Sequence, residues 1–156
     1  MAAIHGRLQE RLPSLECEVT QAHGMSVLRL PPVRLLDVVK VLKEEFQFDL
    51  FLDVTAIDWL PRQPRFEVVH HFYSTRHFVR VRLKTVVPDA DPAVASLVPL
   101  YGAAGIMERE CHDMYGIDFR GNADLRPILL YEGFVGHPLR KDYPKLLEQP
   151  LVPYRK

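Results

Sequence analysis

Hydrophobic and polar positions follow regular spacings over the first thirty residues of the chain. Apolar side chains recur at every fourth position in 4–12 and predict a short amphipathic helix that Pro13 ends. Polar and apolar positions then alternate in 15–20 and 25–30, so these runs predict two strands joined by a turn at 21–24. Because an isolated pair of strands is only marginally stable, we expect further strands to follow.

The middle of the chain predicts one helix and three more strands. Prolines 31 and 32 favour the first turn of a helix that continues to Phe46 with a broad apolar face. Strands are predicted at 49–55, 65–74 and 77–85. In the last strand, alternation directs one set of side chains inward and the other to the opposite face. The inward set is Val79, Val81 and Leu83, and the outward set is a basic ladder of Arg80, Arg82 and Lys84.

A second helical segment is predicted from Pro92 to Tyr115. Asp91 is a good N-cap, a short helix is expected through Leu97, and Gly116 suits the left-handed cap that ends the segment. On a helix of about 100° per residue, the last part has one apolar side and one charged side. The charged side is expected to pair Glu108 with His112 and Arg109 with Asp113 at spacing four.

Beyond Gly116 the periodicity ends, but many apolar residues continue among five prolines, at 127, 138, 144, 150 and 153. Prolines preclude long helices and central strands, and a disordered tail is usually poor in apolar residues. We therefore expect an extended C-terminal arm that buries its side chains on a partner. The predicted fold is α+β: residues 1–116 form a mixed or antiparallel sheet of about five strands packed on helices, and residues 117–156 form the irregular arm.

The amino-acid composition argues against several classes of function. The 156 residues include 20 Lys and Arg against 20 Asp and Glu, so no net field attracts the chain to nucleic acid or anionic lipid. No window has the roughly 20 apolar residues that a membrane helix needs, and the N-terminus lacks a signal-peptide pattern. Two distant cysteines, Cys17 and Cys111, form no Cys-x-x-Cys pair, so reduced intracellular thiols are expected.

Motifs for independent chemistry are not found. The sequence has no dinucleotide fingerprint, phosphate loop, nucleophile elbow or His-Glu-x-x-His motif. The acidic and histidine residues at 108–113 favour an ion-pair network over a metal site or a carboxylate pair for catalysis. His70 and His71 point to opposite faces of a strand, and one is expected to be buried with its ring satisfied. Cys111 is expected to be a core residue rather than a nucleophile.

Four segments, 53–58, 65–71, 108–117 and 132–144, closely resemble the respiratory complex I 30-kilodalton subunit family, to which the C subunit of bacterial NADH-quinone oxidoreductases belongs. The resemblance covers most of the chain, and its two long motifs do not follow from a generic helix or loop. The chain departs from the family in two places. His112 stands where a large aromatic is usual, and 121–126 replaces a Gly-His-Pro-Asp-Leu-Arg pattern.

The resemblance implies a subunit without its own redox centre, in the peripheral arm of a proton-translocating NADH-quinone oxidoreductase on the cytoplasmic side of the membrane. FMN and Fe-S clusters would lie on partner subunits, and this chain would dock on the quinone-site subunit, which is the 49 kDa-type or D subunit. No catalytic, cofactor or metal residue is expected on it. The expected partner interface comprises Glu108, Arg109, Glu110, His112, Asp113, Arg126, His137, Arg140, Lys141 and Asp142.

At such an interface, Arg140→Glu is expected to impair assembly more than it impairs the isolated fold, because losing one member of a desolvated charge pair can cost about 2–5 kcal/mol. Two alternatives remain open. The chain could be the equivalent subunit of a membrane-bound energy-converting hydrogenase, or a free-standing enzyme that uses the acidic helix.

Overall fold

The computed structural model describes residues 2–147 and 149. Their elements follow in the order α1 (Ala2–Arg11), β1 (Glu18–Ala22), β2 (Met25–Leu30), a 3₁₀ turn (Pro32–Arg34), α2 (Leu35–Phe46), β3 (Leu50–Asp58), β4 (Phe66–Ser74), β5 (Val79–Val87), β6 (Ala93–Ala95), α3 (Ala104–Tyr115) and β7 (Asp118–Arg120). The predicted α+β class and five-stranded main sheet are confirmed.

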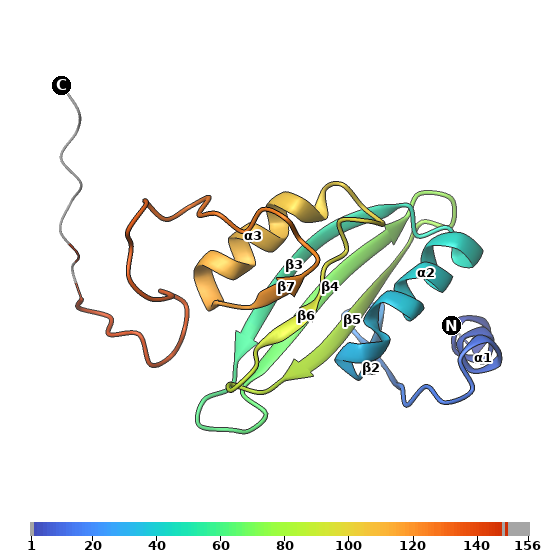
Figure 1. Ribbon diagram of the computed structural model, residues 1–156. Helices are drawn as coiled ribbons and strands as arrows, with labels where there is room; N and C mark the ends of the chain where they lie inside the picture. The colour runs from blue at the N-terminus through green and yellow to red at the C-terminus, as the bar shows by residue number, and fades with distance from the viewer. Residues whose placement is uncertain (1, 148, 150–156) are drawn as a thin grey trace.

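The main sheet has the strand order β1-β2-β5-β4-β3. The β1–β2, β3–β4 and β4–β5 pairs are antiparallel, while β2 and β5 are parallel neighbours, so the sheet is mixed. The chain makes the parallel pair because α2 and the β3–β4 hairpin intervene between β2 and β5. The two short strands β6 and β7 form a separate parallel pair in front of the main sheet (Figure 1).

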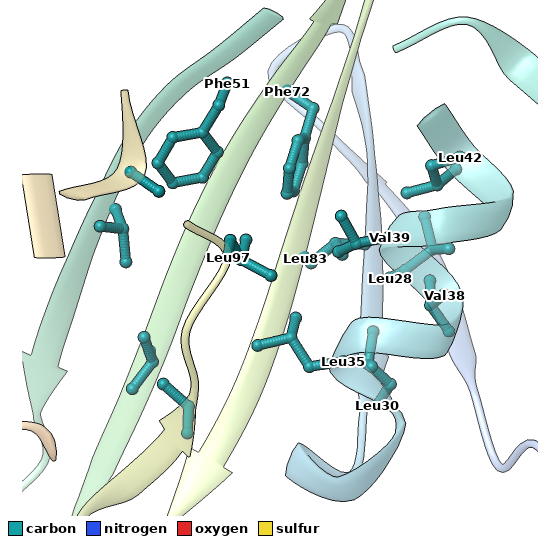
Figure 2. Packing of buried hydrophobic residues seen from close by; sticks show 14 of the residues in the cluster. Leu28, Leu30, Leu35, Val38, Val39, Leu42, Phe51, Phe72, Leu83 and Leu97 are labelled. Atoms are coloured by element: carbon teal, nitrogen blue, oxygen red, sulfur yellow. The ribbon is translucent and has the colours of Figure 1, made fainter. Parts of the chain in front are cut away.

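The hydrophobic core lies between one face of this sheet and the helices. Helix α2 places a buried aliphatic stripe over β2 and β5, and this packing appears in Figure 2. Towards α3, the ring of Tyr101 contacts those of Phe51 and Phe72, and its hydroxyl donates to Phe48 O at 2.6 Å. Val81 and Leu83 are buried as predicted, whereas Val79 is exposed at the start of β5.

The prediction of a helix from Pro92 to Leu97 is wrong. Residues 93–95 form β6, which pairs in parallel with β7. The Asp91 side chain binds Arg120 at 2.7 Å instead of capping a helix, and Pro92 O accepts the N–H of Asp118 at 2.8 Å. A partner strand some 25 residues away therefore decides the conformation, which local spacing could not reveal. Helix α3 begins only at Ala104.

Among the described residues, the regular core extends beyond the predicted boundary at 116. Ile117 and Phe119 are fully buried, and β7 ends at Arg120. After Arg120 the described chain contains neither helix nor strand, and its course follows the end of α3 and then leads away from the sheet (Figure 1). The C-terminal arm is thus irregular, as predicted from its prolines.

Candidate partner-docking site

The end of helix α3 is the surface on which the C-terminal arm is anchored. Gly116 ends the helix at φ 70°, and its N–H donates to His112 O at 2.7 Å. A Cβ on Gly116 would lie 2.4 Å from His137 Nε2 and 2.5 Å from Arg140 Nη2. Glycine therefore serves two purposes here, because it adopts the left-handed conformation and leaves room for two side chains of the arm.

The segment 137–142 of the arm satisfies the carbonyl groups that the helix end leaves without intrahelical donors. The Leu139 N–H donates to Met114 O at 3.1 Å. Arg140 donates from Nε to Tyr115 O at 2.6 Å, and His137 Nδ1 lies 2.9 Å from Asp113 O. The cationic guanidinium also complements the negative end of the helix dipole. Arg140 is therefore engaged within the chain.

An ion cluster around the buried side chains of Arg65 and Asp58 fixes the next part of the arm to the β3–β4 hairpin. Arg65 is 2% exposed and donates to the carboxylate of Asp58 at 2.8 and 3.0 Å, to that of Asp142 at 2.7 and 3.0 Å, and to that of Asp89 at 3.2 Å. The backbone N–H of Lys141 donates to Asp58 at 2.8 Å. Three segments that are distant in sequence, the β3–β4 hairpin, the loop after β5 and the arm, meet at one guanidinium.

In this cluster the positive charge of Arg65 stabilises the ionised carboxylates around it. Burial by itself disfavours the charged form of Asp58, but the Arg65 guanidinium and two backbone N–H groups outweigh it and hold the pKa of Asp58 well below its usual range. Hydrogen bonds from Arg65 likewise lower the pKa of Asp142. The carboxylates of Asp58 and Asp142 are therefore ionised at neutral pH, and each one keeps the Arg65 charge compensated.

Asp113 and Glu108 connect α3 to other parts of the chain. One oxygen of Asp113 accepts the N–H groups of Ile128, Leu129 and Leu130 at 2.7, 2.9 and 3.3 Å. Burial opposes ionisation of Asp113, yet these three donors keep its pKa below the usual range. Asp113 thereby fixes the bend at which the arm leaves the helix.

Glu108 is fully buried, and its carboxylate accepts hydrogen bonds from Ser96 Oγ and Leu97 N at 2.7 Å each and from Asn122 Nδ2 at 2.9 Å. Burial raises the pKa of Glu108, while these donors counter the rise. Asn122 lies in the segment that departs from the family pattern, and it supplies one of the donors. Glu108 joins α3 to the loop after β6 and to the start of the arm.

The predicted ion pairs along α3 are wrong. Glu108 and Asp113 are buried against other segments, so they do not face solvent or pair with His112 and Arg109. Arg109 instead donates to Arg126 O and Pro127 O at 2.8 Å each, and His112 Nδ1 lies 2.9 Å from Ile117 O. The charged side of the helix is covered by the chain's own loops and arm.

The ten residues predicted for a partner interface fall into three groups. Glu108 and Asp113 are buried, while Arg109, His112, His137 and Arg140 are half-buried between α3 and the arm. The exposed members are Glu110, Arg126, Lys141 and Asp142. The structure brings most of the set together around the end of α3, where their side chains fix the arm.

Sequence reasoning missed Asp58, Arg65 and Asp89 as members of this arrangement. One signal was available: Asp58 and Arg65 are opposite charges at the two ends of the loop that joins β3 and β4, where a hairpin brings its ends together. Their connection to Asp142 spans 77 residues and had no local signal.

Apolar side chains of the arm lie mainly on its outer surface. The exposed fraction is 62% for Leu129, 74% for Val135, 52% for Leu139 and 94% for Leu146. Between α3 and the arm is a small cleft of about 180 Å³ that His112 and His137 line. Polar contacts thus fix the arm while several of its large hydrophobic side chains stay accessible, which is typical of a protein-docking surface.

Within residues 2–147 and 149, no group of three or more His, Cys, Asp or Glu side chains could hold a metal ion. No helix in this part of the chain is both long enough and apolar enough to span a bilayer. Cys111 is buried, and burial raises the pKa of its thiol well above the usual range.

The family model and the similar proteins indicate the same family. Residues 28–149 match the model of the family described as respiratory-chain NADH dehydrogenase, 30 Kd subunit. The chain is 40% identical over 139 residues to the NADH-quinone oxidoreductase C subunit of Geobacter sulfurreducens, and the match covers 88% of this chain and 86% of that protein. It is also 40% identical over 146 residues to the C subunit of the Brucella abortus enzyme, covering 92% of this chain and 72% of that protein.

Two solved structures resemble the fold. One is a trypsin-resistant fragment of Nqo5, residues 1–134 of that protein, with a TM-score of 0.67 and 28% identity over 80% of this chain and all of the fragment. The other is a chain of the membrane-bound sulfane sulfur reductase, an archaeal respiratory membrane complex. Its TM-score is 0.77, with 28% identity over 92% of this chain and 85% of that chain.

Proposed function

The chain belongs to the 30 kDa subunit family of respiratory-chain NADH dehydrogenases, and we propose that it is a structural and assembly subunit in the peripheral arm of a proton-translocating NADH-quinone oxidoreductase. In this role it docks on the quinone-site subunit and supports electron transfer from NADH to quinone without carrying electrons itself. FMN and the Fe-S clusters reside on partner subunits, and the peripheral arm that contains this chain lies on the cytoplasmic side of the membrane.

The observation that carries this proposal is the contrast within the C-terminal arm. Its backbone is fixed by Asp113, Arg140 and the Arg65 cluster, while Leu129, Val135 and Leu146 extend away from the chain. A fixed backbone reduces the conformational entropy lost on binding, because the arm already follows a defined course. The exposed apolar side chains then supply the area that a partner subunit buries.

The relatives support the same role. The fragment of Nqo5 that resisted trypsin ends at residue 134 of that protein, which indicates that a compact core can be separated there from the later residues. We expect the same division here: a core that is stable by itself and an arm that gains protection only when it is covered by a partner subunit.

A second candidate function has a specific observation behind it. The structural likeness to a chain of the membrane-bound sulfane sulfur reductase, with a TM-score of 0.77, indicates that this fold serves respiratory membrane complexes with other substrates. An energy-converting hydrogenase would be another complex of this kind. The relatives from NADH-quinone oxidoreductases, at about 40% identity, favour the NADH-linked complex over either one.

Purification from the native cell tests the proposal. The chain, tagged at its natural locus, is isolated gently from solubilised membranes, and its partners are identified by mass spectrometry. We expect flavoprotein, iron–sulfur and quinone-site subunits to accompany it. A nickel-hydrogenase large subunit or a sulfur-reductase subunit would select the second candidate. Recovery of the chain alone from the soluble fraction would contradict both and would direct attention to catalysis by the chain itself.

A further inference from the structure

The main sheet has a second face that the helices do not cover (Figure 1). On this face a groove of about 320 Å³ crosses strands β1, β2, β5 and β4. We call it the basic groove and define it by Glu18, Val27, Arg29, Glu67, Arg82 and Lys84, which line it. None of these residues belongs to the C-terminal arm or touches its anchoring contacts.

Charge is unevenly distributed along the basic groove, although the whole chain has a formal charge of +0. Glu67 is 3% exposed and accepts hydrogen bonds from Lys84 at 2.8 Å and Arg29 at 3.1 Å, so two cations surround one buried carboxylate. Arg82 adds another positive charge, and Arg80 continues the row beside the groove on the same face of β5. Four cations thus face the carboxylates of Glu18 and Glu67, and Asp53 lies farther along the same face, beside His71.

Two of these cations have no ionic partner in the part of the chain that the structure describes. The guanidinium of Arg80 lies over the ring of Tyr73 at 5.2 Å, and Arg82 donates to His71 Nε2 at 3.3 Å. Accepting this bond requires a neutral imidazole, and burial together with the nearby Arg82 charge lowers the pKa of His71, which favours that form. Arg82 is therefore held in place by a neutral imidazole and forms no ion pair within the described residues.

We propose that the basic groove binds an extended acidic segment of another protein subunit, whose carboxylates pair with Arg80 and Arg82. Alternate side chains of a strand lie about 7 Å apart on one face, so Arg80, Arg82 and Lys84 form a row with the same repeat as alternate side chains of an extended peptide. Arginine forks suit carboxylates, because two N–H groups can bind the two oxygens at once.

A protein partner fits better than nucleic acid or a membrane. Glu67 and Glu18 lie among the cations and would repel a continuous row of phosphates, whereas a peptide can place its carboxylates selectively. The sequence as a whole provides no net positive field for either polyanion. Val27, which is 5% exposed, also lines the groove, and its side chain suits contact with small apolar groups between the acidic side chains.

The test uses the purified full-length chain and a fluorescein-labelled decapeptide of alternating glutamate and threonine, with the glutamine version as its control. At about 0.01 M salt, where the Debye length is about 30 Å, the acidic peptide should bind and the glutamine peptide should not. The double variant R80E/R82E should weaken binding at least tenfold, while R80K/R82K, which keeps the charges, should retain most of it.

A matched variant separates local recognition from net charge. R62E/R126E changes the total charge equally at two exposed arginines outside the groove, and it should bind the peptide nearly as well as the natural chain. Equal losses in both double-glutamate variants, with thermal unfolding unchanged, would overturn the proposal. Preferential binding of single-stranded DNA or anionic vesicles through Arg80 and Arg82, or full competition by an equal concentration of inorganic phosphate, would also overturn it.

Discussion

The core and the C-terminal arm of this chain reach order by opposite means. In the core, regular elements bury apolar side chains such as Leu28, Leu42 and Phe72 almost completely. In the arm, charged and backbone groups make most of the contacts with the core and the rings of Tyr131, Phe134 and Tyr143 pack on one another, while Leu129 and Leu146 remain exposed. The comparison teaches that apolar content alone does not tell where a segment buries its side chains. The arm is held mainly by polar groups, and the proposed function assigns its exposed apolar groups to contact with another subunit.

The largest effect on both regions is expected from replacing Arg65, whose side chain contacts the core and the arm. Arg65→Met leaves Asp58 buried without its cation and frees Asp142, so the free energy of unfolding should fall by about 3–5 kcal/mol. Urea unfolding followed by circular dichroism measures this change. Arg62→Met, at an exposed arginine three residues earlier, is the control and should change stability by less than about 0.5 kcal/mol. A loss below about 1 kcal/mol in Arg65→Met would show that the cluster contributes little.

Removing the Asp113 carboxylate should separate the two regions. Asp113→Ala leaves three backbone N–H groups of the arm without their acceptor, at an expected cost of about 1–3 kcal/mol. Trypsin should then cut the arm faster, while the core fragment survives. Glu110→Ala, on the exposed side of the same helix, should leave the cleavage rate unchanged. Equal acceleration of core and arm cleavage would mean that the two are not separate units.

His70 offers a test confined to the core. The sequence predicts that one of His70 and His71 is buried with its ring satisfied. His70 is the fully buried one, but neither of its ring nitrogens has a hydrogen-bond partner among the described residues. Burial lowers its pKa to about 3 from an ordinary value of 6.5. The folded state therefore holds His70 neutral, and the unfolded chain takes up the proton first as pH falls below 6.5.

The stability that depends on neutral His70 is thus present above pH 6.5 and is lost as pH falls towards 3. His70→Phe removes the cost of burying two ring nitrogens without hydrogen-bond partners, so the substitution should be neutral or stabilising at pH 7. Its advantage over the natural chain should grow by about 2 kcal/mol between pH 7 and pH 5. Denaturant unfolding at several pH values measures the difference, and His77→Phe, at an exposed histidine, is the control. A difference independent of pH would contradict the assignment to His70.

The smallest effect on the isolated chain is expected from the exposed apolar residues of the arm. The triple variant L129S/V135S/L146S should change the free energy of unfolding by no more than about 0.5 kcal/mol per site. In the native cell it should nevertheless reduce the amount of chain recovered with membrane partners. Normal recovery would show that these side chains are not the docking surface. Val33→Ser provides the control, because Val33 is an exposed apolar residue outside the arm.

The sequence was sufficient for the parts of the fold that local patterns determine. Helix α2, the β3–β5 strands and the Gly116 cap follow from periodicity, proline and glycine, which act over a few residues. Strand β6 was mistaken for a helix because only β7, across the intervening helix, makes it a strand. Pairing between strands that are distant in sequence cannot be predicted from the spacing of apolar residues within one strand.

The same distinction explains the candidate site. Most of the predicted residues do gather at the end of α3, because the two long motifs contain them. Their individual contacts could not be predicted, since Glu108 meets Ser96 and Asn122, and Asp142 meets Arg65, only after the chain has folded. Arg140 in particular serves the helix end, so Arg140→Glu should already disturb the isolated chain.

Hydrogen–deuterium exchange, read by mass spectrometry on the isolated chain and on the same chain within its purified membrane complex, tests the central claim most directly. In the isolated chain, we expect peptides from 131–136 and 144–147, outside the amides that Asp113 holds, to exchange faster than those of α2 and β4. In the complex, the arm peptides should slow by about 100-fold, equivalent to about 2.7 kcal/mol, and the core should change little. Equal protection of the arm with and without partners would contradict the account.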